Sequence, residues 1–188
     1  VHPAWGTNQH TDYWIWVQGI SKNYEEVLGL DSTDPDRIEL IEQLKQSYGE
    51  LSQTASDIEP FEKIESTLIA AIRSTKMRLI NSYRDNQDII WDDDYYWLLV
   101  GGEVFGRGFT VKGLTVTYMP RVQTGTGNMD TMQQRARFFG YKAEYLSFCR
   151  VYVDQSIKDF FTDYVWSEEH TRNKLKSFNE TNQHLGEF

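Results

Sequence analysis

Apolar residues recur every three or four positions through the first 76 residues of the chain, the spacing typical of amphipathic helices. Local signals mark where the first of these predicted helices ends and where the second begins. Gly29 is expected to end the first, and Asp34 followed by Pro35 is expected to begin the second, because Asp caps a helix and Pro suits its first turn. The pattern predicts three helices that form a structural scaffold, over about residues 11–29, 34–51 and 57–72.

The pattern changes after Lys76, where short apolar runs alternate with Gly-rich or helical connectors. Apolar runs with little alternation are typical of strands that are covered on both faces. We expect one helix after Asp130, a second after Asp154 and a third over about 167–178. Strands that alternate with helices indicate an α/β fold with a parallel sheet, covered by helices on both faces. The predicted strands of this single sheet are residues 77–82, 96–101, 114–119 and 148–153.

The amino-acid composition excludes several classes of protein. Of the 188 residues, 39% are hydrophobic and 14% aromatic, which is enough to bury a core and excludes wholesale disorder. No apolar run approaches the roughly 20 residues of a membrane helix, so we expect no membrane association. The single cysteine, Cys149, excludes a disulfide framework and a multi-cysteine zinc site. The chain opens VHPAW, with neither an initiator Met nor a signal peptide, so we expect a cytoplasmic fragment of a larger protein.

Charge is unevenly distributed along the chain. The formal net charge of −9 argues against a protein that coats nucleic acid generically. Residues 101–153 nevertheless contain seven basic and only three acidic residues. Such a segment is either an anion-binding site or a chance cluster on a solvated face.

Several well-known catalytic motifs are absent. The chain lacks the G-x-x-x-x-G-K-[ST] phosphate loop, the G-x-S-x-G elbow and the H-E-x-x-H zinc motif. The acidic run at residues 92–94 would supply oxygen ligands for magnesium in a nuclease. Such a nuclease also needs an acid-x-Lys on the following strand, which the chain lacks, so a solvated turn before the strand is the preferred interpretation.

Two segments carry the candidate chemistry. The first, GGEVFGRGFTVKGLT (101–115), follows a predicted strand and places Arg107 in a glycine-rich turn. Glycines there allow close approach of the backbone to a ligand. The second, MDTMQQRARFFGYKAEY (129–145), places glutamines and arginines at a predicted helix start. Arginine offers a planar fork of donors that matches phosphate oxygens.

The order of these segments resembles the second RecA-like lobe of superfamily-two helicases, with an R-G turn followed by a Q/R-rich helix. The closer resemblance is to the Z1 domain family, which comprises endonuclease-like and helicase-like proteins of bacterial restriction and phage-defence systems. The residues that match the pattern of this family are GG at 101–102, RGFT at 107–110, GLTVTY at 113–118, DTMQQRARFFGY at 130–141 and CRVY at 149–152.

The resemblance implies catalytic roles for two arginines. Arg137 would be an arginine finger that neutralises charge on a transferring phosphoryl group, and Arg107 would belong to the coupling turn. The competing interpretation of Arg107 is a structural ion pair with an acid such as Glu103. The chain departs from the helicase pattern at Ala136 and Gly140, where Gly and a second Arg are usual. The remaining implied nucleotide-binding or phosphate-binding residues are Gly106, Gly108, Thr110, Gln133, Gln134, Arg135 and Lys142.

By this resemblance the chain is a single C-terminal lobe of a P-loop NTPase, with a helical part (1–76), a motif-bearing α/β part (77–166) and a C-terminal helix and tail (167–188). The larger protein would bind ATP and magnesium between this lobe and a missing P-loop lobe, and would act on DNA, with other defence-operon subunits as further partners. The fragment alone is expected to bind no cofactor and to be inactive. A magnesium-dependent endonuclease and a non-catalytic DNA-binding or assembly module remain alternatives.

Overall fold

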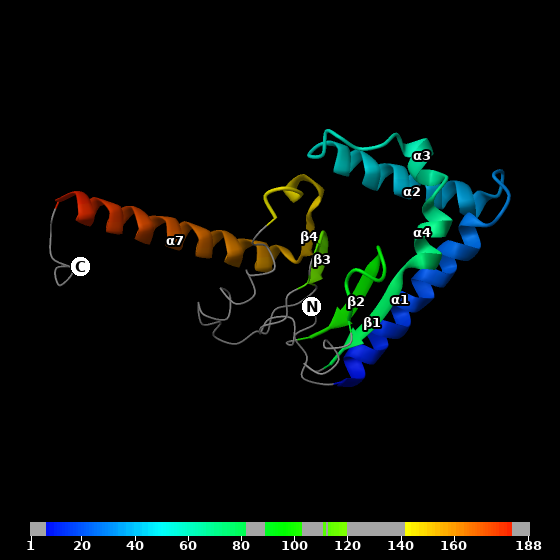
Figure 1. Cartoon of the computed structure of the whole chain (residues 1–188), viewed down its shortest axis with the longest axis horizontal. Helices are drawn as coiled ribbons and strands as arrows, with labels where there is room; N and C mark the ends of the chain where they lie inside the picture. The colour runs from blue at the N-terminus through cyan, green and yellow to red at the C-terminus, as the bar shows by residue number, and fades with distance from the viewer. Residues whose placement is uncertain (1–6, 82–88, 103–110, 112, 120–141, 182–188) are drawn as a thin grey trace.

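The computed structural model describes residues 7–81, 89–102, 111, 113–119 and 142–181 (Figure 1). These residues form a mixed α/β structure in which helices come first, short parallel strands follow and a long helix comes last. No helix among them is long and apolar enough to cross a membrane.

The first two helices begin and end at the residues that favour those boundaries. Helix α1 (Thr7–Leu28) ends where the Gly29 amide donates to the carbonyls of Glu25 and Glu26, at 3.2 and 3.1 Å. Helix α2 (Pro35–Ser52) begins with the predicted cap, since the Asp34 carboxylate accepts from the Asp36 amide at 3.0 Å. Both helix predictions are confirmed, although α1 starts four residues earlier than expected.

The third predicted helix is two shorter ones, α3 (Phe61–Glu65) and α4 (Leu68–Ser74). At the break, the Ser66 hydroxyl donates to the Lys63 carbonyl at 2.7 Å and the Thr67 hydroxyl donates to the Ile64 carbonyl at 2.8 Å. Hydroxyl groups that bond nearby carbonyls compete with the backbone ladder, which explains why the helix stops here. These helices pack in one core cluster with α1 and α2, centred on Leu28, Leu40, Ile41 and Phe61.

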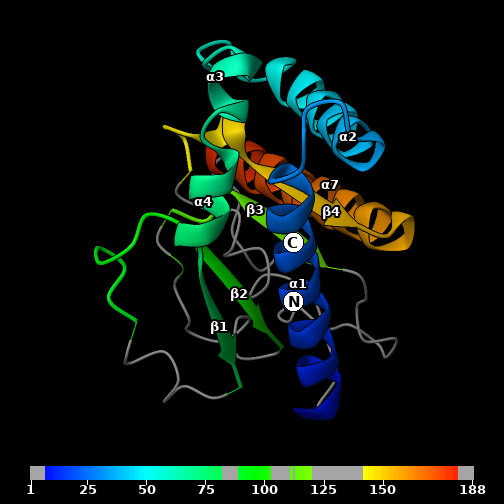
Figure 2. The ribbon, with the colours of Figure 1, turned by 90° about the vertical axis from the view of Figure 1, so that its right-hand side faces the viewer.

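The first two strands, β1 (Lys76–Ile80) and β2 (Trp97–Gly101), pair in parallel with Ile80 opposite Gly101. Helix α1 contacts both strands and runs beside them (Figure 2). Ile80 is fully buried and forms a second core cluster with Ile89, against which Trp97 and Leu99 of β2 also pack. Side chains alternate along a strand, so the neighbours of Leu99 point to the opposite face.

The second pair of strands, β3 (Val116–Met119) and β4 (Arg150–Val153), is also parallel, with a short 3-10 helix, η3 (Leu146–Phe148), before β4. The predicted parallel orientation is thus confirmed in both pairs. The prediction of one four-stranded sheet is wrong for the described residues, which form two separate two-stranded sheets. Strand β4 is also less covered than predicted, because Val151 and Tyr152 are 43% and 49% exposed.

The last two predicted helices are one continuous helix, α7 (Gln155–Thr181). The Asp154 carboxylate accepts from both the amide and the hydroxyl of Ser156 at 3.0 Å, as the predicted cap requires. No Gly or Pro interrupts residues 155–181, so nothing in the sequence ends the helix near residue 167. The helix predicted after Asp130 lies outside the described residues.

Candidate functional site

The edge formed by the carboxyl ends of β1 and β2 is the part of the structure nearest in sequence to the Arg107 turn. Parallel strands bring their carboxyl ends to the same edge, where open α/β folds bind ligands. The edge is closed by Gly101 and Gly102, both of which are buried. Because glycine has no Cβ, other groups can approach its backbone closely at such a position. The Gly-Arg-Gly turn begins four residues after Gly102.

A histidine from α1 reaches the same edge. His10 is 7% exposed, and its Nδ1 lies 2.9 Å from Oδ1 of Asn81, the residue that follows β1. Because an amide oxygen only accepts hydrogen bonds, Nδ1 of the imidazole carries the hydrogen. The contact joins residues 71 positions apart and fixes the first turns of α1 against the end of β1. This pair could not be predicted from the sequence, since neither residue belongs to a recognisable motif.

Of the predicted site residues, only Lys142 is among the described residues. The two candidate catalytic arginines, Arg107 and Arg137, lie outside the described residues, so their roles stay predictions. The same holds for the candidate phosphate-binding residues Gly106, Gly108, Thr110, Gln133, Gln134 and Arg135.

Lys142 is buried, with 7% of its surface exposed, and its ammonium donates to the Leu114 carbonyl just before β3. It also lies 5.9 Å from the centre of the Tyr145 ring, within the range of a cation–π contact. Burial lowers the pKa of Lys142, and the nearby Cys149 acts in the opposite direction. In this arrangement the ammonium anchors the segment after residue 141. To bind a phosphate it would first have to leave the Leu114 carbonyl.

Arg150, part of the basic stretch, binds protein carbonyls. One guanidinium nitrogen donates to the carbonyls of Ser147 and Cys149 at 3.1 and 2.8 Å. The other donates to the carbonyls of Glu50 and Leu51 at 3.1 and 3.3 Å, and to the Thr54 hydroxyl at 2.7 Å. A cation at the carboxyl end of a helix is favoured by the helix dipole. Arg150 therefore joins the end of α2 to β4.

The acidic run at residues 92–94 lies before β2, at the amino edge of the sheet and away from the Gly101–Gly102 edge. Asp94 is 3.8 Å from the Lys76 ammonium, and its carbonyl accepts from the Trp97 indole at 2.9 Å. Among the described residues, no three His, Cys, Asp or Glu side chains are placed to hold a metal ion. The arrangement fits the solvated turn better than the nuclease interpretation.

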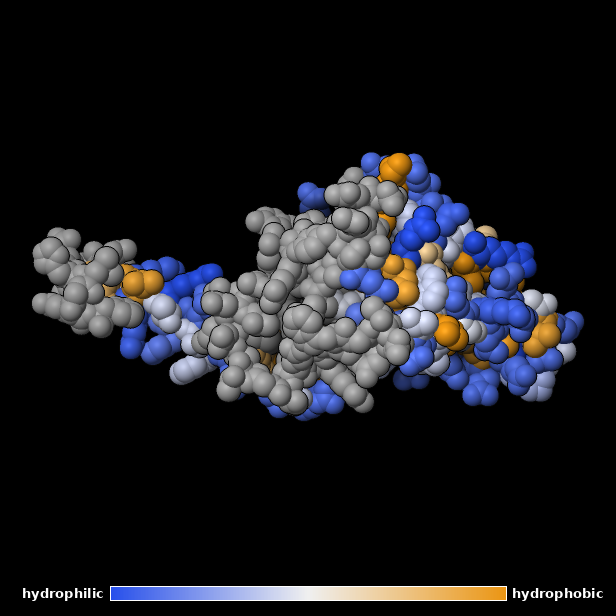
Figure 3. Space-filling view, turned by 90° about the horizontal axis from the view of Figure 1, so that it is seen from below, coloured by the Kyte–Doolittle hydropathy of each residue, from blue (hydrophilic) through white to orange (hydrophobic). Residues whose placement is uncertain are grey.

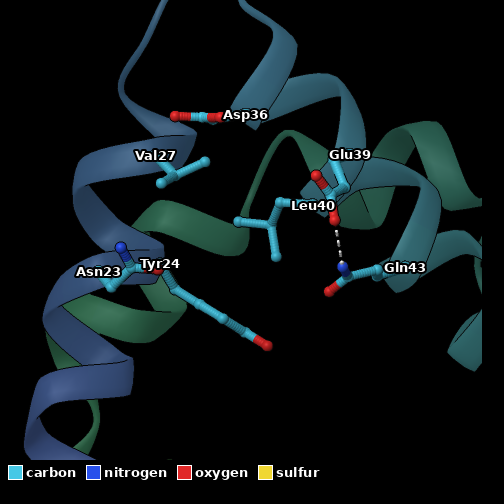
Figure 4. A pocket seen from close by; sticks show the side chains of 7 residues that line it. All are labelled: Asn23, Tyr24, Val27, Asp36, Glu39, Leu40 and Gln43. Atoms are coloured by element: carbon cyan, nitrogen blue, oxygen red, sulfur yellow. Dashed lines mark hydrogen bonds between the residues drawn. The ribbon is translucent and has the colours of Figure 1, made fainter.

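A hollow of about 210 Å³ lies between α1 and α2 (Figure 4). Its mouth is polar, and Gln43 donates to Glu39 across one turn of α2 at 3.3 Å. It holds none of the motif residues and lies in the helical scaffold. The residues that line it are Asn23, Tyr24, Val27, Asp36, Glu39, Leu40 and Gln43.

Comparison with known proteins gives one positive result. The family model described as "Z1 domain" matches residues 1–188, the whole chain. Neither a curated protein nor a solved structure matches the chain significantly.

Proposed function

The chain belongs to the Z1 domain family, and we propose that it is the C-terminal RecA-like lobe of an ATP-dependent, DNA-acting, helicase-like protein of a bacterial restriction or phage-defence system. The lobe supplies an arginine finger, Arg137, and a coupling turn around Arg107 to a P-loop lobe in the same or a neighbouring chain. Its partners are that lobe, DNA and other subunits of the system.

The main support for the proposal is the parallel β1–β2 pair, which has two buried glycines at its carboxyl edge. The Gly-Arg-Gly sequence at residues 106–108 follows this edge in the chain, and nucleotide-binding α/β folds bind their ligands at the carboxyl ends of such strands. Strand β3 ends at Met119, and Arg137 follows 18 positions later in the sequence. Both candidate arginines thus follow the carboxyl ends of strands that belong to parallel pairs.

The groups available in this lobe suit one side of a shared nucleotide site. Phosphoryl transfer requires the phosphates and a magnesium ion to be held before an arginine can stabilise the developing charge. The chain lacks a phosphate loop, and its described residues lack a magnesium-binding cluster. ATP would supply the transferred group, and the side chains of this lobe would contribute the positive charge. The donor set therefore fits a lobe that completes a site built mainly elsewhere.

Arginine suits this role for geometric and electrostatic reasons. Its guanidinium is always charged and contacts two phosphate oxygens at once, whereas lysine acts as a point charge. A finger acts mainly in the transition state, so its loss lowers the rate more than it lowers nucleotide affinity.

The test uses a protein that contains both lobes. Arg137→Ala is expected to lower the DNA-stimulated ATPase rate by about 10³-fold, with a much smaller change in nucleotide affinity. Arg137→Lys is expected to recover little of the rate. Lys158→Ala, an exposed substitution on α7, is the control and should leave the rate unchanged. A wild-type rate for Arg137→Ala would make Arg137 a structural residue and refute the assignment.

A second assay distinguishes the proposed function from the alternative of a nuclease. The 188-residue chain alone is expected to cleave no DNA and to hydrolyse no ATP, with or without magnesium. Magnesium-dependent cleavage by the isolated chain, abolished by Asp92→Asn and Asp93→Asn together, would support the endonuclease function instead.

A further inference from the structure

Helix α7 projects away from the other described elements for most of its length (Figures 1 and 3). Its 27 residues span about 40 Å at 1.5 Å per residue. Ile157 in the first turn is 3% exposed. Further along, the large apolar side chains of Val165, Trp166 and Leu175 are 52%, 68% and 40% exposed.

Four residues of this projecting part share one narrow face. Val165, Glu168, Arg172 and Leu175 follow one another at intervals of three, four and three residues. This is the spacing of the positions that meet at the seam of a two-helix coiled coil. The seam is apolar at its two ends and carries one acid and one base in the middle.

Charge is divided along the same helix. Residues 159–169 contain four carboxylates, Asp159, Asp163, Glu168 and Glu169, and neither Lys nor Arg. Residues 170–178 contain three basic residues, Arg172, Lys174 and Lys176, and no acid. A parallel pair of these helices would place like charges together, whereas an antiparallel pair brings each acidic half against a basic half.

We propose that α7 is a self-association surface that pairs antiparallel with α7 of a second copy of this chain. With the twofold axis near His170, Glu168 of each copy lies opposite Arg172 of the other, and Val165 lies opposite Leu175. The contact is isologous, so every pair occurs twice. This proposal is independent of the proposed ATPase role.

The mutual position of Glu168 and Arg172 allows a charge-swap test by analytical ultracentrifugation of the full 188-residue chain. The wild-type chain is expected to dimerise within concentrations up to roughly 100 μM, which covers weak but specific association. Glu168→Arg alone and Arg172→Glu alone should each raise the dimer dissociation constant by at least about tenfold, because two attractions become repulsions.

Mixing the two single variants is the decisive measurement. One copy then carries two arginines and the other two glutamates at the central positions, so the mixture should form a heterodimer with affinity near that of the wild type. Recovery in the mixture also shows that both variants are folded. The control, Asp163→Arg, makes the same charge change on the opposite side of α7 and should dimerise like the wild type.

Three outcomes would overturn the proposal. These are a wild-type chain that stays monomeric throughout the concentration range, single variants that dimerise as tightly as the wild type, and a mixture that does not associate. Val165→Ser provides a second check that leaves all charges in place, and it should weaken the dimer as well. A monomeric wild-type chain would mean that the exposed face of α7 serves a different partner.

Discussion

Removing the Arg150 guanidinium should release the end of α2 from β4. In the structure this one group donates to four carbonyls and a hydroxyl, on two segments that are about a hundred residues apart in sequence. Arg150→Met keeps most of the length and volume of the side chain but removes every donor. The substitution therefore tests the hydrogen bonds separately from packing.

The expected cost follows from the number and kind of these bonds. A hydrogen bond to a charged group contributes a net 1.5–3 kcal/mol or so, and a cation at a helix carboxyl end adds about 0.3–1 kcal/mol. Arg150 is only partly buried, so water replaces some of the lost contacts. We expect a loss of about 2 kcal/mol in the free energy of unfolding, because the bonds share one group and do not add. For a chain of this length, that corresponds to a decrease of about 4–8 °C in melting temperature.

Urea unfolding and amide hydrogen exchange provide the two readouts. The amides of Thr54 and Ala55, which donate to the Leu51 carbonyl, should exchange faster in Arg150→Met than in the wild type. Arg78→Met, on an exposed position of β1, is the matched control and should stay within about 0.5 kcal/mol of the wild type. If Arg150→Met unfolds at the wild-type urea concentration, the contacts add nothing to stability and the reasoning is wrong.

Two further predictions concern titratable groups. The hydrogen bonds from Ser156 hold the pKa of Asp154 below its usual value, so its contribution to stability is present at neutral pH and is lost as pH falls through that lower pKa. Asp154→Ala should therefore melt below the wild type at neutral pH, and the difference should become smaller on acidification, as followed by circular dichroism. Burial lowers the pKa of Lys142, so the folded state loses its proton before the unfolded state as pH rises. Wild-type stability relative to Lys142→Met should therefore increase with pH as the lowered pKa is passed; equal urea profiles at all pH values would contradict this.

Local signals in the sequence predicted most of the helices and strands. Asp34, Gly29 and Asp154 mark helix ends through hydrogen bonds within a few residues, so the sequence alone identifies them. The parallel orientation was predicted from the alternation of strands with helical connectors. The break at Ser66 was missed because a helical apolar stripe continues across it.

Contacts between residues that are distant in the sequence could not be predicted from the sequence. The pairing of four short strands into two sheets depends on tertiary packing, since a run of four or five apolar residues fits either arrangement equally well. The His10–Asn81 bond and the carbonyl contacts of Arg150 join distant segments through ordinary polar residues. Arg150 was counted in the basic stretch only for its charge, and nothing in the sequence indicated that its guanidinium binds carbonyls of its own chain.

Leu114 contacts both the β1–β2 pair and Lys142, the first described residue after the Arg137 segment. Its side chain packs against the Ile80–Ile89 cluster of the β1–β2 pair, and its carbonyl accepts from Lys142. Lys142 is five residues after Arg137, and the Arg107 turn follows the edge of that same β1–β2 pair. The described chain that follows the Arg137 segment is thus tied to the β1–β2 core, and Gly102 at the end of that core precedes Arg107 by five residues in the sequence. Loss of the Lys142 contact would loosen this tie, so in a two-lobe protein Lys142→Met should lower the ATPase rate through the position of Arg137, without removing a phosphate ligand.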